Sequence, residues 1–409
     1  MSKLEELINT QCPNGVNYKE LWELTAWDKK FNAVEKEKQT KVIRYHYFLA
    51  ADLKPLIVEG GNVKILTTNT SSLYTTEELA CEYLSEGEIV CIPWGGNPNV
   101  QYYKGKFITA DNRIATSLNT EILDNKFLYY YLQNQLDVIA TFYRGSGIKH
   151  PSMQKVLGLK IPVPPIAVQR EIVRILDNFT ELTAELTAEL TARKKQYEYY
   201  RDSLILEQNI EYKTLGEIAT EIYRGSGIKR DEVTQEGIQC VRYGEIYTTY
   251  DIWFDKCVSH TNEEKISSKK YFEHGDILFA ITGENVEEIA KSCAYVGNDK
   301  CLSGGDIVVM KHNENPKYLA YALSTTDAQR QKSYGKIKSK VVHASVPSIK
   351  SIFIPLPPLD EQQRIADILD KFHSLVTDIS QGLPAEIEAR NKQYEYYRDK
   401  LLTFKEKSE

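Results

Sequence analysis

The chain has 409 residues, 42% of them hydrophobic, and a formal net charge of −6 at pH 7. This length exceeds what one hydrophobic core usually serves, so we expect at least two globular domains. No apolar run approaches the roughly 20 residues of a membrane helix, and no apolar segment follows the first residues, which argues against a signal peptide and favours a cytoplasmic protein without membrane contact.

Residues 1–155 contain short alternating runs of Tyr, Ile, Val, Thr and Gly, which are typical of a mixed α/β domain. Gly87-Glu-Ile-Val90 predicts a turn that enters a buried strand, and Lys126-Phe-Leu-Tyr-Tyr-Tyr-Leu132 predicts a helix. We therefore expect the first domain to span residues 1–155.

Two segments of this domain, Lys29-Lys30-Phe31-Asn32 and Trp94-Gly95-Gly96-Asn97, place cations or amides beside aromatic residues. Lys and Arg bind phosphates or guanine, and Asn can read adenine in the DNA major groove. Solvated charges at the edge of a core would give the same pattern. The candidate DNA contacts here are Lys29, Lys30, Asn32, Trp94 and Asn97.

The heptapeptide Tyr-Arg-Gly-Ser-Gly-Ile-Lys occurs twice, at 143–149 and at 223–229. Two glycines around a serine predict a loop whose backbone can approach a phosphate, and the flanking cations supply charge. An ordinary glycine turn is the alternative. The two copies lie at different places in their domains, so they need not be equivalent. The candidate DNA contacts are Arg144, Ser146, Lys149, Tyr223, Arg224, Ser226 and Lys229.

A long helix is predicted after Ile161-Pro-Val-Pro-Pro165, because this segment cannot continue a helix and neither Pro nor Gly follows until Gly216. The helix can run to about Leu206, which is roughly 40 residues or about 60 Å. We assign residues 156–208 to this first spacer. Its apolar stripe contains Ile172, Ile175, Leu176, Phe179, Leu182, Leu186 and Leu190.

Within this helix the tetrapeptide Thr-Ala-Glu-Leu occurs at 183–186 and again at 187–190. Each unit adds about 6 Å and turns the stripe by about 40°, since four residues exceed one turn of about 3.6 residues. We interpret the repeat as a spacer of functional length. A plain solvated coiled coil is the alternative.

The second domain is expected over residues 209–348, where Gly275-Asp-Ile-Leu278 again predicts a turn and a strand and Lys317-Tyr-Leu-Ala-Tyr-Ala-Leu323 a helix. Six Lys or Arg residues and no acidic residue lie between Ala328 and Lys350, so basic charge is concentrated there despite the acidic total. Further candidate DNA contacts are Arg242, Tyr243, Lys336 and Lys338.

Residues 349–409 repeat the first spacer. Ile354-Pro-Leu-Pro-Pro358 matches 161–165, and Lys-Gln-Tyr-Glu-Tyr-Tyr-Arg-Asp occurs at both 195–202 and 392–399. The second copy has four more residues between these two matching segments. The second helix is predicted to begin after Pro358 and to reach about Phe404. Gly382-Leu383-Pro384 should break or kink it midway. Gln169, Ile172, Leu176, Asp177 and Phe179 recur as Gln362, Ile365, Leu369, Asp370 and Phe372.

The similarity extends to the start of the chain, because Tyr18-Lys-Glu-Leu21 near the N-terminus parallels Tyr212-Lys-Thr-Leu215, which follows the first spacer. This favours a tandem repeat with pseudo-twofold symmetry and neighbouring termini. Two amphipathic helices that cannot bury their stripes alone pair most simply as an antiparallel intramolecular coiled coil. The expected fold class is α+β, with two mixed α/β domains separated by two long antiparallel helices.

Catalytic motifs are missing from the sequence. There is no G-x-x-x-x-G-K-[ST], H-E-x-x-H or G-x-G-x-x-G, and no Asn-Pro-Pro-aromatic motif of the amino-methyltransferases. The seven cysteines contain no C-x-x-C pair, which predicts reduced core thiols rather than a metal site. We therefore expect no catalysis, no cofactor and no metal.

Two diverged domains that alternate with two nearly identical Pro-introduced helices resemble the DNA-specificity subunits of Type I restriction-modification systems. The Thr-Ala-Glu-Leu repeat resembles the spacer of one subgroup, and the resemblance covers nearly the whole chain. It implies two target-recognition domains, each reading half of a bipartite, asymmetric target in double-stranded DNA. It also implies helices that dock two methyltransferase subunits, joined by ATP-dependent restriction subunits. These partners would bring S-adenosylmethionine, Mg²⁺ and ATP.

Two other interpretations remain at this point. The DNA-recognition portion of a fused nuclease-methyltransferase would need catalytic motifs. A coiled-coil adaptor would not need diverged Tyr- and Gly-rich loops with basic flanks.

Overall fold

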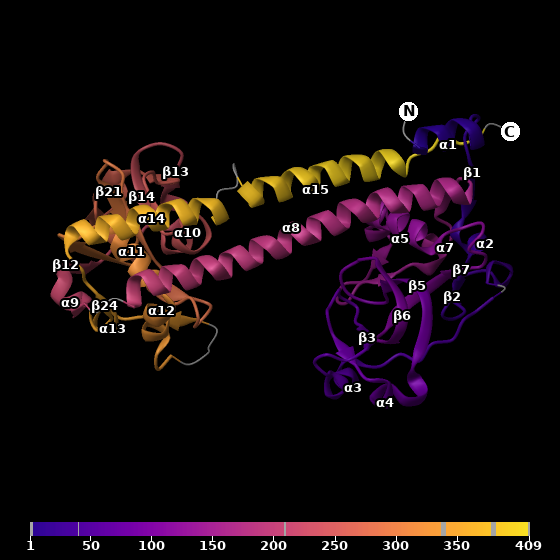
Figure 1. The fold of residues 1–409 in the computed structure, drawn as a ribbon, viewed down its shortest axis with the longest axis horizontal. Coiled ribbons are helices and arrows are strands. Elements are labelled where there is room, and N and C mark those ends of the chain that lie inside the picture. The colour runs from indigo at the N-terminus through magenta and orange to yellow at the C-terminus, as the bar shows by residue number, and fades with distance from the viewer. Residues whose placement is uncertain (1–2, 40, 208–209, 337–340, 378–381, 408–409) are drawn as a thin grey trace. The chain divides into compact units, whose positions relative to one another are not determined.

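The computed structural model describes residues 3–39, 41–207, 210–336, 341–377 and 382–407. The chain forms two compact units: unit 1 comprises Met1–Glu185 with Ile387–Glu409, and unit 2 comprises Leu186–Glu386. Each unit contains one sheet-rich domain (Figure 1). Among the residues described, none of the helices combines the length and apolarity required of a membrane span.

Unit 1 is built on a six-stranded sheet with the order β2-β7-β5-β6-β3-β4. The central strand β5 pairs antiparallel with β6 and β7, and β3 is parallel to β6. Ile89 and Val90 of β5 are buried, as predicted. The prediction of a turn at Gly87 is wrong, because Gly87 lies within β5 and pairs with Gly105. The strands are β2 (Thr25–Trp27), β3 (Val63–Leu66), β4 (Tyr74–Thr75), β5 (Ser85–Pro93), β6 (Gln101–Thr109) and β7 (Asn112–Ser117).

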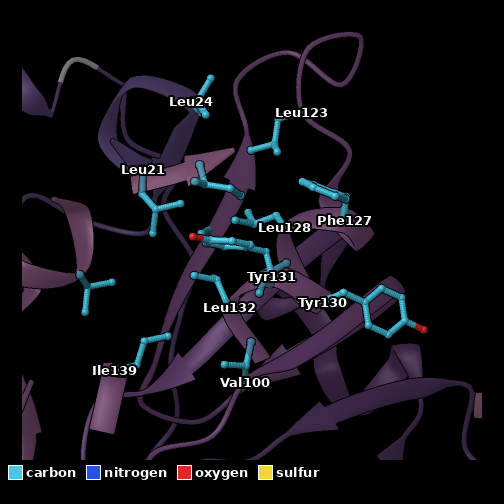
Figure 2. Packing of buried hydrophobic residues seen from close by; sticks show 14 of the residues in the cluster. Leu21, Leu24, Val100, Leu123, Phe127, Leu128, Tyr130, Tyr131, Leu132 and Ile139 are labelled. Atoms are coloured by element: carbon cyan, nitrogen blue, oxygen red, sulfur yellow. The ribbon is translucent and has the colours of Figure 1, made fainter. Parts of the chain in front are cut away.

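Helix α5 (Asn125–Asn134) packs against β5 and confirms the helix predicted in this region. Asp124 caps it, since its carboxylate accepts hydrogen bonds from the backbone N–H groups of Lys126 and Phe127 at 2.8 and 3.0 Å. Figure 2 shows Phe127, Leu128 and Tyr131 among the core residues of unit 1. Burying each such side chain stabilises the fold by about 1.5–3 kcal/mol.

The two terminal segments of the chain meet in unit 1 (Figure 1). Val16 N–H donates to the carbonyl oxygen of Lys405 (2.9 Å), and Lys407 N–H donates to the carbonyl oxygen of Val16 (3.0 Å), so the expected proximity of the termini is confirmed.

The remaining elements of unit 1 are α1 (Lys3–Gln11), β1 (Asn17–Glu20), α2 (Leu21–Leu24), α3 (Ala50–Leu53), α4 (Glu77–Ala80), α6 (Leu136–Ala140), β8 (Tyr143–Arg144), β9 (His150–Pro151), α7 (Met153–Leu157), β10 (Lys160–Val163) and 3₁₀ turns at Lys36–Lys38, Lys54–Leu56 and Cys81–Tyr83.

Unit 2 contains two five-stranded sheets. The first has the order β12-β22-β18-β20-β15 and comprises β12 (Ala219–Arg224), β15 (Trp253–Phe254), β18 (Ile277–Ala280), β20 (Ser292–Tyr295) and β22 (Ile307–His312). The second has the order β13-β16-β14-β21-β17 and comprises β13 (Val233–Thr234), β14 (Ile238–Val241), β16 (Ser259–Thr261), β17 (Tyr271–Phe272) and β21 (Cys301–Ser303). Gly275, with φ +92°, lies two residues before the buried strand β18, which confirms the turn and strand predicted there.

The tandem repeat is visible in how the strands pair. β1 pairs antiparallel with β10, with Lys19 opposite Ile161, and β11 pairs antiparallel with β24, with Lys213 opposite Ile354. The other elements of unit 2 are β11 (Tyr212–Thr214), α9 (Leu215–Ile218), α10 (Tyr243–Thr248), β19 (Thr282–Gly283), α11 (Pro316–Ser324), α12 (Thr326–Ser333), β23 (Val342–His343), α13 (Val346–Lys350), β24 (Phe353–Pro355) and 3₁₀ turns at Arg230–Glu232 and Glu263–Lys265. Helix α11 confirms the prediction made for this region.

Helix α8 (Ile166–Leu206) begins after Pro165 and ends at Leu206, as predicted. The second helical segment is divided into α14 (Leu359–Thr377) and α15 (Gly382–Leu401). Gly382 has φ +69°, which does not continue a right-handed helix, so the predicted break is confirmed. α8 runs from unit 1 into unit 2, whereas α14 begins in unit 2 and α15 ends in unit 1.

A buried glutamine attaches each helical segment to the domain that precedes it. Gln169 is fully buried, donates to the carbonyl oxygen of Pro164 (2.7 Å) and accepts from Asp124 N–H (2.9 Å). In unit 2 the same bonds join Gln362 to Pro357 (2.8 Å) and Asn315 (2.9 Å).

An aspartate about two helical turns further on repeats this attachment. Asp177 accepts from Lys126 Nζ (2.8 Å) and from the Tyr130 hydroxyl (2.6 Å). The counterparts in unit 2 are Asp370, Lys317 (2.6 Å) and Tyr321 (2.7 Å). The Gln and Asp residues that recur in the sequence are thus the attachment points of the repeat.

The repeated octapeptides pack on aromatic residues near the start of the other helical segment. Phe179 stacks on Tyr397 in unit 1, with ring centroids 5.5 Å apart, and Phe372 stacks on Tyr200 in unit 2, at 6.2 Å. Each unit therefore contains one ring contact between the two helical segments, and the coiled-coil pairing along their length stays a prediction.

The cysteines are free thiols throughout the residues described. Six of them are buried, as expected, but Cys81 is exposed, because it begins a short 3₁₀ turn at the surface with φ +48°.

Candidate nucleic-acid interface

Trp94 is the centre of the candidate surface in unit 1. Lys29 Nζ lies 5.1 Å and Arg113 Cζ 4.9 Å from the centroid of the indole ring, and the His150 ring centroid is 5.2 Å away. These residues come from the segment after β2, from β7 and from β9, so three distant parts of the sequence meet at one aromatic ring. Cation–π attraction stabilises this arrangement.

The loop between β8 and β9 lies against the glycine turn that follows Trp94. Gly96 N–H donates to the carbonyl oxygen of Lys149 (3.0 Å), and His150 Nδ1 donates to that of Trp94 (2.7 Å). A Cβ on Gly95 would lie 2.9 Å from Ile148 Cγ2, so this close approach favours glycine. The first heptapeptide and the Trp94 segment, which are separate candidates in the sequence, therefore form one surface. Arg144, Ser146 and Lys149 are exposed on it.

Arg113 is fully buried beneath Trp94. Its Nη1 lies 2.7 Å from Asp28 Oδ2, and its Nη2 pairs with Asp111. Burial raises the pKa of the Asp28 carboxyl group, although the charge of Arg113 acts in the opposite direction. This ion-pair cluster forms a fixed base for the indole ring.

Sequence reasoning missed Arg113, Asp28 and His150. Arg113 and Asp28 are single charged residues next to apolar strands, and nothing in the linear sequence indicates that they pair. The fixed distance between His150 and the Pro-rich strand, which recurs between His343 and the second Pro-rich strand, was the one available signal.

The other candidates in this unit are exposed. Lys30 and Asn32 follow Lys29, and Asn97 follows the glycine turn. In the part of unit 1 that is described, no contact joins these three side chains to Trp94.

The second heptapeptide has a different position from the first, as expected. Tyr223 and Arg224 end strand β12. Arg224 Nε donates to the carbonyl oxygen of Gly305, and its Nη2 pairs with Asp306 Oδ1, both at 2.6 Å. The half-buried Tyr223 donates its hydroxyl to the carbonyl oxygen of Tyr271. Arg224 and Lys229 are exposed.

Ser226 is buried and does not present its hydroxyl at the surface, which differs from the exposed loop that was expected. Its N–H donates to the carbonyl oxygen of Ser303 (3.0 Å). A Cβ on the preceding Gly225 would lie only 2.2 Å from the carbonyl oxygen of Gly304. The loop is therefore packed tightly on the turn before β22.

A hollow of about 450 Å³ adjoins this loop. It brings together the second heptapeptide, the Arg242-Tyr243 pair and the turn at Gly305. Arg242 Nε and Nη2 each lie 3.0 Å from Glu245 Oε1, and Tyr243 is exposed. The hollow is lined by residues that include Gly227, Arg230, Arg242, Tyr243, Gly305 and Asp306.

The basic segment 328–350 is only partly a surface feature. Lys336 Nζ donates to the carbonyl oxygen of His343 (2.8 Å), and Lys338 lies outside the described residues. Lys332 is buried and donates to the carbonyl oxygen of Leu323 (2.8 Å), and burial lowers its pKa to about 7. Lys332 therefore does not belong to the exposed basic surface of this segment.

The chain matches the model of the family described as Type I restriction modification DNA specificity domain twice, over residues 31–193 and 207–389. It therefore belongs to the Type I restriction-modification DNA-specificity family. The specificity subunit of the Escherichia coli type I restriction enzyme EcoR124I/EcoR124II is 35% identical over 304 residues, which cover 71% of this chain and 74% of the relative. A putative type I specificity subunit from Haemophilus influenzae is 32% identical over 340 residues, covering 79% and 84%.

Solved structures share the fold. The crystal structure of the S subunit of the type I restriction-modification system from M. genitalium superposes with a TM-score of 0.53 at 16% identity, covering 95% of this chain and 96% of that one. A chain from a structural study of type I complex assembly and conformational transition gives a TM-score of 0.59 at 14% identity, covering 95% and 98%.

Proposed function

We infer that this chain is the DNA-specificity subunit of a Type I restriction-modification complex, in which each domain reads one half of a bipartite, asymmetric target. The observation that carries this function is the pair of domains that are framed by corresponding strand pairs but have different cationic surfaces. In unit 1 the cations meet at Trp94, and in unit 2 they line the hollow beside Arg242. We assign recognition to residues 1–155 and 209–348, and spacing to 156–208 and 349–409.

The contacts proposed with DNA are of two kinds. Exposed cations at the loops, such as Arg144, Lys149 and Lys229, bind phosphates and set the register of the protein on the duplex. Side chains near Trp94 in unit 1 and beside the hollow in unit 2 read base edges. The exposed Lys30, Asn32 and Asn97 and the basic segment that contains Lys336 and Lys338 belong to the same proposal.

The helices are proposed to dock two methyltransferase subunits, which ATP-dependent restriction subunits join. The Thr-Ala-Glu-Leu repeat of α8 supports the proposal that the chain belongs to the subgroup with this spacer. In this proposal the chain works in the cytoplasm and is not catalytic, and the partner subunits supply S-adenosylmethionine, Mg²⁺ and ATP.

Reconstitution tests the function. The purified chain alone should neither methylate nor cleave DNA, whereas the chain with its methyltransferase subunits should methylate one bipartite sequence. Methyl transfer by the isolated chain would contradict the proposal, and so would methylation without sequence preference by the complex.

A further inference from the structure

We propose that Arg242 reads a guanine in the half-site bound by unit 2, and that Glu245 is the positioning residue that holds Arg242 for this contact. The inference rests on the proposed function and adds a base and a mechanism to it.

The hollow is formed by the close approach of three backbone segments. A Cβ on Gly304 would lie 2.9 Å from the carbonyl oxygen of Val241, and a Cβ on Gly305 would lie 3.0 Å from Gly227 Cα. Gly304 N–H also donates to the carbonyl oxygen of Val241 (2.8 Å). Glycines at these positions let the segments meet, so the floor beside Arg242 is rigid backbone.

Glu245 holds the guanidinium group from one side. Its carboxylate is buried, with Oε1 accepting from Arg242 Nε (3.0 Å) and from the Ser259 hydroxyl (2.6 Å). Oε2 accepts from the backbone N–H of Arg242 (3.0 Å). The carboxylate therefore fixes both the main chain and the side chain of Arg242, which reduces the conformational entropy lost when DNA binds.

The orientation of the guanidinium group suits a base better than a phosphate alone. Glu245 occupies the edge of the guanidinium group that Nε and Nη2 share, which leaves three of the five N–H bonds. Two of these three, one on each Nη atom, point from the end of the side chain. This end-on pair matches the O6 and N7 acceptors of guanine in the major groove. The Arg242 side chain is 33% exposed, so its end is accessible from the hollow.

Arg230 lines the same hollow and is the matched control. It is exposed and belongs to a short 3₁₀ turn. We assign it to phosphate contact, which carries no base preference. The two arginines therefore predict different outcomes at one site.

The experiment uses the chain assembled with its methyltransferase subunits and a panel of duplexes in which each base pair of the target is replaced in turn. Arg242→Ala should lower affinity for the target about 5- to 150-fold and abolish discrimination at one G·C pair. Arg230→Ala should lower affinity by a similar factor for every duplex and leave discrimination unchanged. A uniform loss with Arg242→Ala would overturn the proposal and make this residue a phosphate contact.

Glu245→Gln tests the positioning role. The amide keeps the size of the side chain but removes the charge that orients Arg242, so discrimination should weaken at the same G·C pair while affinity for unrelated DNA stays equal or rises. A merely structural role would instead lower thermal stability and affinity for all duplexes together. Arg242→Lys keeps the charge without the two-pronged end and should resemble Arg242→Ala in discrimination. If the wild-type complex showed no base preference, the proposed function itself would be refuted. If the wild-type complex showed a preference that Arg242→Ala left unchanged, only the role of Arg242 would be refuted.

Discussion

Each domain has an ion pair between the segments of two corresponding strands, with the charges exchanged. In unit 1 Asp28, just after β2, pairs with Arg113 of β7 at 2.7 Å. In unit 2 Arg224, at the end of β12, pairs with Asp306, just before β22, at 2.6 Å. The strands concerned pair antiparallel in both units.

The burial of these pairs differs as much as their polarity. The side chains of Arg113 and Asp28 are 0% and 9% exposed, whereas those of Arg224 and Asp306 are 58% and 37% exposed. One framework therefore supports an interior ion pair beneath an aromatic ring in one domain and a surface ion pair beside a hollow in the other. The comparison shows that the two domains share the antiparallel strand pairing but differ in which charged residues stand at the strand ends and in how deeply these residues are buried.

The largest expected effect comes from changing the spacer while both domains stay intact. We predict that one further Thr-Ala-Glu-Leu unit inserted after Leu190 of α8 abolishes methylation of the original target and transfers it to a target whose unread spacer is one base pair longer. The insertion adds about 6 Å and about 40° of helix. One DNA base pair turns by roughly 34–36°, and a domain that faces away from its groove loses all base contacts, so rotation decides the outcome.

Methylation assays on targets whose spacers differ by single base pairs would measure this. Retention of the original spacing, or altered half-sites, would show that the repeat only supports the helix. An insertion of Ala-Ala-Ala-Ala at the same point is the matched control and should shift the spacing equally.

The buried ion pair predicts the next largest effect. Arg113→Met should destabilise unit 1 by about 3–5 kcal/mol, because it leaves the buried Asp28 carboxylate without its partner. Arg224→Met should change the stability of unit 2 by about 1 kcal/mol or less, since its ion pair is exposed. Denaturant unfolding of both variants would compare them. Adding Asp28→Asn to Arg113→Met should restore part of the loss, and equal effects in the two units would contradict the comparison.

Trp94→Ala should reduce DNA affinity by about 1–3 kcal/mol, the size of one mismatched base pair, and should alter base preference in one half-site only. The indole ring contacts Lys29, Arg113 and His150, so its loss removes the ring contacts of these three side chains, while the ion pairs of Arg113 and the backbone hydrogen bonds of the loop remain. Binding to duplexes with either half-site changed would test this. An equal change in both half-sites would show that the domains do not read DNA separately.

The smallest effects concern the second heptapeptide. Replacing Arg224 or Lys229 with Ala should weaken binding by the full complex without unfolding unit 2, and each lost phosphate contact should lower the slope of log affinity against log salt by about one unit. Arg144→Ala and Lys149→Ala are the counterparts in unit 1. Unchanged affinity and slope after both Arg224 and Lys229 are replaced would reduce this loop to an ordinary glycine turn.

The sequence by itself determined the elements whose cause is local. Pro165 and Pro358 mark the helix starts, the absence of Pro and Gly up to Gly216 allows the length of α8, and Gly382 predicts the break, because proline and glycine act within one turn of backbone. The repeat itself followed from identical segments in register.

Only the tertiary structure decided which charges are available to DNA. Lys332 lies in a basic run yet is buried, Ser226 is buried in a loop that is exposed in its other copy, and Arg113 lies beneath Trp94. Each outcome depends on strands distant in sequence that pack on that residue, and burial sets the cost of a charge. A linear pattern of cations and glycines therefore locates a candidate interface, while cross-strand packing selects the side chains that are exposed at it.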